Sequence, residues 1–192
     1  MNDIIICNVS KSFGDKSVLN DFSCTFPEEK ISVIMGESGC GKTTLVNIIM
    51  GLLKADAGEI SGIPSRISAV FQEDCLSEDF SAVSNVRAIT GRKVSKANIA
   101  AHLAALGLTE KDITIPVRDL SGGMKRRVAI ARAILADSEL VIMDEPFKGL
   151  DNDTRKSVID FVLSETQGRT LIVITHSPEE IQLLSAEHII RL

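Results

Sequence analysis

A glycine-rich segment carries the clearest chemical signal in this sequence. Residues Gly36–Thr44 fit the pattern G-x-x-x-x-G-K-[ST] and stand between an apolar run and a helical pattern. Glycines let the backbone curl so that successive N–H groups point at phosphate oxygens, and a following helix N-terminus adds positive potential. We expect Lys42 to reach the β- and γ-phosphates of a nucleotide and the Thr43 hydroxyl to ligate Mg²⁺. The alternative is a structural glycine-rich turn.

Two carboxylates follow a buried apolar run further along the chain. Leu140–Met143 is apolar throughout, and Asp144 and Glu145 come directly after it. Ligands bind at the carboxyl edge of a parallel sheet, where such a strand would end. We expect Asp144 to hold Mg²⁺, directly or through water, and Glu145 to polarise an attacking water as general base. Taken alone, the pair also fits a strand end followed by acidic turn residues.

Two further segments fit a phosphate site. His176 follows the apolar run Thr170–Thr175. If this run is a strand of the same sheet, His176 would lie at its carboxyl edge and contact a terminal phosphate. The alternative is a capping or surface residue. Ser121, Gly122 and Gly123 begin a helical pattern, where exposed N–H groups suit an anion. As an isolated tripeptide, this segment would be only a loop.

A basic run follows this tripeptide. Lys125, Arg126 and Arg127 are consecutive in a chain whose formal net charge is −5 and whose pI is about 5.3. An acidic balance gives no electrostatic footprint for DNA or RNA. We therefore expect a solvated helix face here rather than a nucleic-acid patch.

Short β-branched runs alternate with helical patterns, which predicts an α/β fold. Runs that are apolar on both faces are typical of strands buried in a parallel sheet. The expected strands are Ile4–Val9, Lys30–Met35, Ile67–Phe71, Glu139–Met143 and Thr170–Ile174. The expected helices are Lys42–Leu52, Lys96–Leu106, Ser121–Ala136 and Asn152–Glu165, with another after the N-cap Ser177.

The middle of the chain lacks the buried strand pattern and contains several helical segments. We expect one domain over residues 1–192, with a helical lobe at about residues 73–135 inserted between two strands. The alternative is a helical layer on a single sheet.

Composition narrows the class of protein. The chain has no Trp, no Tyr and seven Phe, which argues against an aromatic platform for single-stranded nucleic acid. No apolar run approaches the roughly 18 residues of a spanning helix, and the start lacks the features of a signal peptide. The four cysteines form no C-x-x-C pair, so we expect reduced thiols in a cytosolic protein.

The order of the motifs is similar to that of the ATP-binding subunit of an ABC transporter, and this resemblance covers Phe13–His176. Gly36–Thr44 resembles the Walker A motif, and Leu140–Glu145 resembles Walker B with its catalytic glutamate. Leu120–Met124 resembles the family signature LSGGQ. The remaining matches are Gln72 to the Q-loop glutamine, Gly149-Leu150-Asp151 to the D-loop and His176 to the H-loop histidine.

The resemblance implies a P-loop NTPase core with a mostly parallel sheet, an N-terminal antiparallel β part and an inserted helical lobe. It implies ATP and Mg²⁺ as cofactors, with Glu145, His176 and Gln72 as catalytic residues and Thr43, Gln72 and Asp144 at the metal. The expected nucleotide-binding residues are Phe13, Gly36, Glu37, Ser38, Gly39, Cys40, Gly41, Lys42, Thr43, Thr44, Ser121, Gly122, Gly123 and Asp151.

The resemblance also implies partners. Two copies, as a homodimer or heterodimer, would enclose two ATP molecules, with Ser121 and Gly123 of one copy contacting the γ-phosphate held by Lys42 of the other. A transmembrane permease would dock beside the helical lobe, with a solute-binding protein in an import system and no nucleic acid. The chain would thus lie at the cytoplasmic face of the cell membrane. Phe71–Asp74 and Asp144–Phe147 favour an importer of nitrate, sulfonate or taurine type.

This chain departs from the family pattern at several positions. Phe13 stands where Tyr is more usual, so its ring would stack on adenine; the alternative is a core Phe near the first strand. The signature ends in Met124 instead of Gln, and Lys148-Gly149 replaces the frequent Ser-Ala. We expect activity to survive these changes. We expect Cys40 to be passive, with sensitivity to thiol reagents as the alternative.

Other classes fit less well. A non-transport ABC ATPase of repair, translation or cofactor assembly is the main alternative, but the long coiled-coil insertion of repair members and the second domain of translation members are missing. A regulatory subunit with a degenerate site is disfavoured because Glu145, His176 and Gln72 are present. A small GTPase is disfavoured because no N-K-x-D motif occurs. Only 16 residues follow His176, so we expect no C-terminal regulatory domain.

Overall fold

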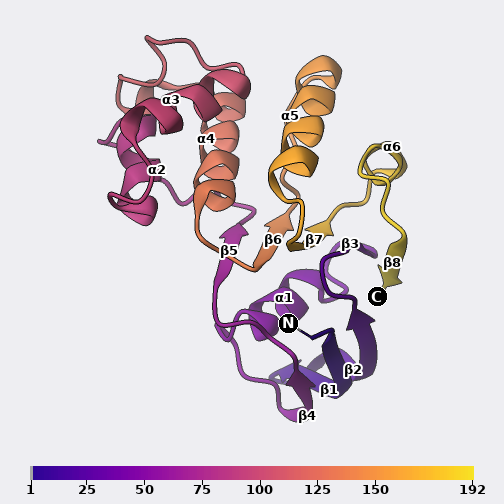
Figure 1. Ribbon diagram of the computed structural model, residues 1–192. Helices are drawn as coiled ribbons and strands as arrows, with labels where there is room; N and C mark the ends of the chain where they lie inside the picture. Colours follow the sequence, from indigo (N-terminus) through magenta and orange to yellow (C-terminus); the bar gives the residue numbers. More distant parts are fainter. Residues whose placement is uncertain (1) are drawn as a thin grey trace. The chain divides into compact units, whose positions relative to one another are not determined.

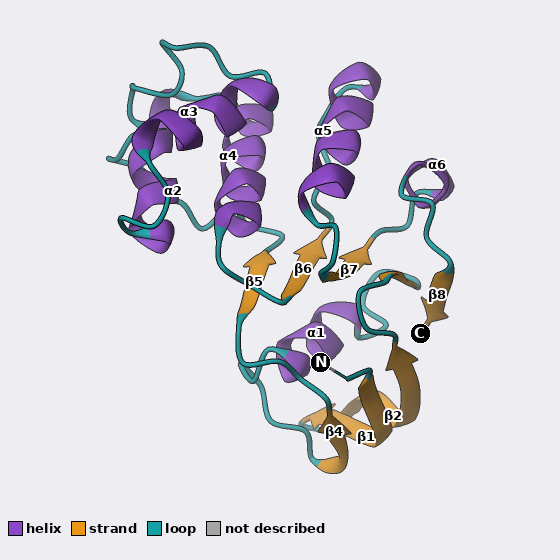
Figure 2. Cartoon of the chain, viewed as in Figure 1, coloured by secondary structure: helices purple, strands orange, loops and turns teal. Residues whose placement is uncertain are grey.

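The computed structural model describes residues 2–192, which form two compact units. The first unit comprises the chain up to Ile67 together with Glu139–Asp144 and Gly168–Leu192. The second unit comprises Ser68–Ser138 and Glu145–Gln167. Figure 1 follows the chain through both units, and Figure 2 separates its strands from its helices.

A parallel sheet forms the centre of the first unit. Its strands β6 (Leu140–Asp144), β7 (Thr170–Ile174), β3 (Ile31–Met35) and β8 (His188–Arg191) are hydrogen-bonded in that order. Every residue of β6 and β7 is buried, as expected for a parallel strand covered on both faces. The predicted strands Lys30–Met35, Glu139–Met143 and Thr170–Ile174 are confirmed within one residue at each end, whereas β8 was not predicted.

An antiparallel sheet completes the β structure of the first unit. β1 (Ile4–Phe13) lies between β2 (Lys16–Phe26) and β4 (Ala57–Ser61). β1 continues four residues past its predicted end at Val9, since its outer half pairs with β2 through a bulged register. The expected α/β class, with a parallel sheet and an N-terminal antiparallel part, is confirmed.

The helices of the first unit follow β3 and β7. Helix α1 (Lys42–Ile49) is three residues shorter than predicted and buries the apolar side chains Leu45, Val46, Ile48 and Ile49. Helix α6 (Pro178–Leu183) begins at the predicted N-cap, where the Ser177 hydroxyl accepts a hydrogen bond from the Glu180 N–H.

The second unit is helical. It contains α2 (Ala82–Thr90), α3 (Lys96–Ala105), the short 3₁₀-helix η1 (Val117–Asp119), α4 (Gly122–Leu135) and α5 (Asn152–Glu165). α2, α3 and α4 pack on one another, and α5 packs on α4 (Figure 1). The segment at residues 73–135 lies in this unit, which also includes α5. The strand β5 (Ile67–Val70) begins in the first unit and continues into the second.

Within residues 2–192, no helix has the length and apolar character needed to cross a membrane.

Candidate ATP site

The phosphate loop is a tight turn between β3 and α1, and at two positions, Gly36 and Gly41, only glycine fits. A Cβ added at Gly41 would lie 2.9 Å from Val18 Cγ1, and the backbone of Gly41 has φ 110°. A Cβ at Gly36 would lie 2.9 Å from the carbonyl oxygen of Leu192. Other residues cannot take this backbone conformation and close approach without strain. The loop therefore leaves its N–H groups near the N-terminus of α1.

Lys42 points back into this loop. Its Nζ donates hydrogen bonds to the carbonyl oxygens of Gly36 (2.9 Å) and Glu37 (2.8 Å) and lies 3.8 Å from Cys40 Sγ. These hydrogen bonds hold the ammonium group inside the turn of the phosphate loop.

All four cysteines are free thiols, as the sequence predicts, and burial raises the pKa of the Cys24 thiol to about 12.

Three strand ends align at the carboxyl edge of the parallel sheet. In register, Asp144 of β6 faces Ile174 of β7, and Ile174 faces Ile34 of β3. Gly36 and His176 each follow two residues after this row. The sheet therefore brings the phosphate loop, Asp144 and the exposed His176 to one edge, as the sequence predicts.

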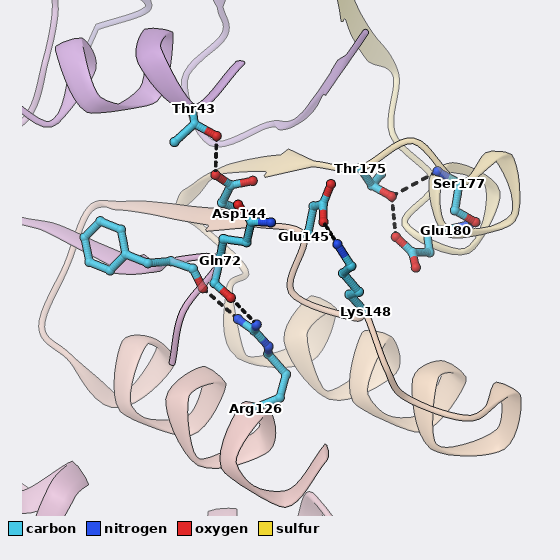
Figure 3. Close-up of polar contacts among 10 residues, drawn as sticks. Thr43, Gln72, Arg126, Asp144, Glu145, Lys148, Thr175, Ser177 and Glu180 are labelled. Atoms are coloured by element: carbon cyan, nitrogen blue, oxygen red, sulfur yellow. Dashed lines mark hydrogen bonds and ion pairs between the residues drawn. The ribbon is translucent and has the colours of Figure 1, made fainter. Parts of the chain in front are cut away.

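Thr43 and Asp144 place two oxygen atoms that can ligate a metal side by side at this edge. The Thr43 hydroxyl donates a hydrogen bond of 2.7 Å to Asp144 Oδ2, and Asp144 is only 6% exposed (Figure 3). Mg²⁺ prefers hard oxygen ligands and is often bound by one or two protein groups together with substrate phosphates. The pair fits this chemistry. Within residues 2–192, no group of three or more His, Cys, Asp and Glu side chains is placed to hold a metal ion without such help.

His176 sits in a short segment that is fixed on both sides. Before it, the Thr175 hydroxyl donates to Glu180 Oε2; after it, the Ser177 N–H donates to Thr175 Oγ1 at 3.1 Å (Figure 3). The turn between β7 and α6 is thereby ordered while the imidazole stays exposed.

Phe13 is exposed at the end of β1, which excludes the alternative of a core position. The residue is 51% exposed, and its ring centroid lies 5.6 Å from Lys11 Nζ, close enough for a cation–π interaction. Asp56 fixes this strand end, because its carboxylate accepts hydrogen bonds from Lys11 Nζ (2.6 Å) and from the Ser12 N–H (2.8 Å). These hydrogen bonds hold the pKa of Asp56 below its usual value.

In the second unit, the expected signature begins helix α4. The Ser121 hydroxyl is the N-cap and accepts a hydrogen bond from the Met124 N–H at 3.3 Å. A Cβ at Gly122 would meet no atom within 4 Å, so the helix is open at this residue. The exposed N–H groups of this turn suit an anion.

In the basic run after the signature, Arg126 and Arg127 form hydrogen bonds to backbone carbonyl oxygens of the same unit. The prediction of a solvated helix face is therefore wrong. Arg126 is only 11% exposed and donates to the carbonyl oxygens of Phe71 (2.6 Å) and Gln72 (Figure 3). Its Nε lies 3.1 Å from Asp74 Oδ1. Arg127 donates to the carbonyl oxygens of Gly123, Leu106 and Gly107.

These contacts fix the loop that carries Gln72. Arg132, two turns after Arg126 on α4, donates to the carbonyl oxygens of Asp74 (2.9 Å) and Cys75 (2.6 Å). Burial raises the pKa of Asp74, while Arg126, Lys125 and Arg132 act in the opposite direction. The Gln72 backbone is anchored to α4 and its side chain stays exposed.

Glu145 and Asp151 flank a turn in the second unit. Glu145 adopts a left-handed backbone conformation (φ 46°), and its Oε2 lies 2.8 Å from Lys148 Nζ (Figure 3). Asp151 is the N-cap of α5, where its Oδ1 accepts a hydrogen bond from the Thr154 N–H at 3.0 Å, and this bond lowers the pKa of Asp151. Both predicted ends of α5 are confirmed.

Sequence comparisons identify relatives of this chain. The family model described as ABC transporter matches residues 19–148. Aliphatic sulfonates import ATP-binding protein SsuB 1 of Nocardia farcinica is 37% identical over 181 residues, covering 92% of this chain and 73% of the relative. Taurine import ATP-binding protein TauB of Jannaschia sp. is 36% identical, covering 99% and 78%. Nod factor export ATP-binding protein I of Burkholderia lata is also 36% identical, covering 92% and 64%.

Solved structures agree with these matches. The dimeric structure of the bacterial ABC transporter cassette MJ0796 has a TM-score of 0.87 and 28% identity, covering 98% of this chain and 94% of the other. A post-hydrolysis state of the same cassette, bound to ADP and Pi, has a TM-score of 0.86 and 27% identity. With the phosphate loop and the strand ends described above, these findings identify the chain as an ATP-binding and ATP-hydrolysing subunit of the ABC transporter family.

Proposed function

We propose that this subunit binds ATP with Mg²⁺ at the carboxyl edge of its parallel sheet and uses hydrolysis to drive solute import through a membrane permease. The observation that carries the proposal is the Thr43–Asp144 pair. It places two oxygen atoms that can ligate a metal 2.7 Å apart, at the sheet edge that carries the phosphate loop. Lys42 would exchange its loop carbonyls for the β- and γ-phosphates. Thr43 and Asp144 would hold the metal, which supplies charge neutralisation on those phosphates.

The chemical step is assigned to Glu145, Gln72 and His176. Glu145 accepts the proton of the attacking water as general base, and Gln72 orients that water and senses the metal. His176 contacts the γ-phosphate from the ordered turn after β7. The remaining loop residues, Glu37, Ser38, Gly39, Cys40 and Thr44, contribute backbone contacts to the phosphates.

A second copy of an ATP-binding subunit completes the site. Ser121, Gly122 and Gly123 of one copy would contact the γ-phosphate in the other, and Asp151 would lie at the junction. The start of α4 supports this assignment, because Ser121 and Gly122 are exposed at a helix N-terminus, where N–H groups suit an anion. The dimeric solved structure is consistent with such an arrangement.

The adenine base would stack on Phe13, whose exposed ring supports this role. Because base–aromatic stacking contributes about 1–3 kcal/mol, we expect Phe13→Ala to raise the Kd for ATP about tenfold. Phe13→Tyr keeps the ring and should bind ATP normally.

Isothermal titration calorimetry checks both variants. Tripolyphosphate, which has no base, should bind all three proteins equally, and Phe80→Ala serves as a control at another exposed ring. Unchanged ATP affinity in Phe13→Ala would rule out stacking.

The transported solute is assigned to the organic sulfonates. The sulfonate and taurine import proteins support this class, since they match 92% and 99% of the chain. Export is the second candidate, because two Nod factor export proteins match at 36% and 35% identity. In either case the subunit would work with a permease at the cytoplasmic face of the cell membrane.

Transport assays on the isolated complex separate these functions. The tagged chain should co-purify with a transmembrane partner from detergent-solubilised membranes. Reconstituted in proteoliposomes with a matching solute-binding protein, the complex should accumulate labelled taurine or an alkanesulfonate only when ATP is present on the subunit's side. Movement of solute away from that side would favour export. Recovery of the chain without any membrane protein, together with ATPase activity, would favour a non-transport function.

A further inference from the structure

Lys148 contacts the side chain to which the proposed function assigns the proton transfer. Its Nζ lies 2.8 Å from Glu145 Oε2 (Figure 3). The Glu145 side chain is 19% exposed and the Lys148 side chain 61% exposed. The ion pair is therefore sheltered at the carboxylate and open to solvent at the amine.

The backbone between the two residues is restrained, so the turn brings the two side chains together. The Lys148 N–H donates to the Glu145 carbonyl oxygen at 3.3 Å, and Pro146 restricts the next φ angle. Phe147 is 1% exposed and anchors the turn in the core of the second unit. Glu145 itself has φ 46°, a conformation that costs free energy in a residue other than glycine. A strained residue on a fixed turn has few ways to place its side chain.

A carboxylate that acts as general base must face the attacking water in one orientation. A charge-assisted hydrogen bond on one of its oxygens fixes the plane of the group and hence the direction of the other oxygen. Positioning of this kind raises kcat without changing how tightly the substrate binds.

We propose that Lys148 is a positioning residue that orients the Glu145 carboxylate for ATP hydrolysis. The inference rests on the proposed role of Glu145 as general base. Lys148 acts through Glu145 and not through the nucleotide, so its removal should affect turnover and leave ATP binding unchanged.

The test is steady-state hydrolysis of ATP with Mg²⁺ by the full chain. Lys148→Ala should lower kcat about threefold to tenfold and leave KM within about twofold, as expected for a partly exposed pair. Lys148→Arg, which keeps the charge and the reach, should restore most of the rate. Lys156→Ala removes a lysine from the exposed face of α5 and should behave as wild type. Equal ATP affinities and equal thermal melting would show that all variants fold.

A double-mutant cycle identifies the residue through which Lys148 acts. Single-turnover assays with labelled ATP measure the residual rate of Glu145→Gln, and adding Lys148→Ala to that variant should not lower the rate further. An unchanged or raised kcat in Lys148→Ala, no recovery in Lys148→Arg, or the same fold loss in the Glu145→Gln background would each overturn the inference. If Glu145→Gln hydrolyses ATP as fast as wild type, the proposed role of Glu145 fails and the inference fails with it.

Discussion

Glu145→Gln is expected to lower the rate of ATP hydrolysis by about 10²–10⁴-fold, the range that general-base catalysis contributes. The amide has the shape of the carboxylate but cannot accept a proton from the attacking water. The left-handed backbone at this position is unaffected by the change, so the turn should form as before. ATP should still bind, and the proposed ATP-bound dimer should accumulate because its nucleotide is no longer consumed.

Phosphate-release assays and size-exclusion chromatography with ATP and Mg²⁺ check these two results. Glu110→Gln, which makes the same change at an exposed residue of the second unit, is the matched control and should hydrolyse ATP normally. Normal turnover in Glu145→Gln would show that another group takes the proton. Loss of both binding and turnover would show that the substitution disturbs the fold.

Lys42→Ala should raise the Kd for ATP about 100-fold. Lys42 is the one cationic side chain among residues 36–44, and the carbonyl oxygens of Gly36 and Glu37 accept hydrogen bonds from its ammonium group. Hydrogen bonds to charged groups contribute about 1.5–3 kcal/mol each, and the phosphates of ATP would lose at least one. The affinity for adenosine, which has no phosphate, should not change.

The loss of the two loop hydrogen bonds needs its own control, since Lys42→Ala also removes a contact that shapes the loop. Thermal unfolding without nucleotide measures that contribution, and Lys54→Ala tests removal of an exposed lysine of the same unit. An ATP affinity equal to that of wild type would contradict the assignment of Lys42 to the phosphates. An equal loss of adenosine binding would indicate a general change in the site.

The parts of the site that depend on neighbouring residues were predictable from the sequence. The phosphate loop is one continuous segment, and its glycines stand where the backbone requires them. Asp144 and His176 were placed at one edge because β6 and β7 are apolar on both faces and must lie in a parallel sheet. The start of α5 at Asn152 was predicted because a helix N-terminus depends on the residues beside it, here Asp151 and Thr154.

The other features depend on contacts between residues that are distant in the sequence. Arg126 and Gln72 are 54 positions apart, and no local pattern indicates that a guanidinium will bind that particular carbonyl oxygen. A run of basic residues therefore suggested a solvated face. Phe13 was ambiguous because an aromatic residue at a strand end is compatible with burial or exposure, and only the pairing of β1 with β2 decides between them.

The hydrogen bonds from Arg126 to the backbone of the Gln72 loop have a consequence for a pair of ATP sites. Ser121 and Arg126 belong to the same helix, whose first turn would serve the nucleotide of the other copy, whereas Gln72 would serve the nucleotide of its own copy. A displacement of α4 on engaging one nucleotide would therefore move the water-orienting residue of the second site. Within one chain, this arginine would give the two proposed sites a direct physical route to cooperativity.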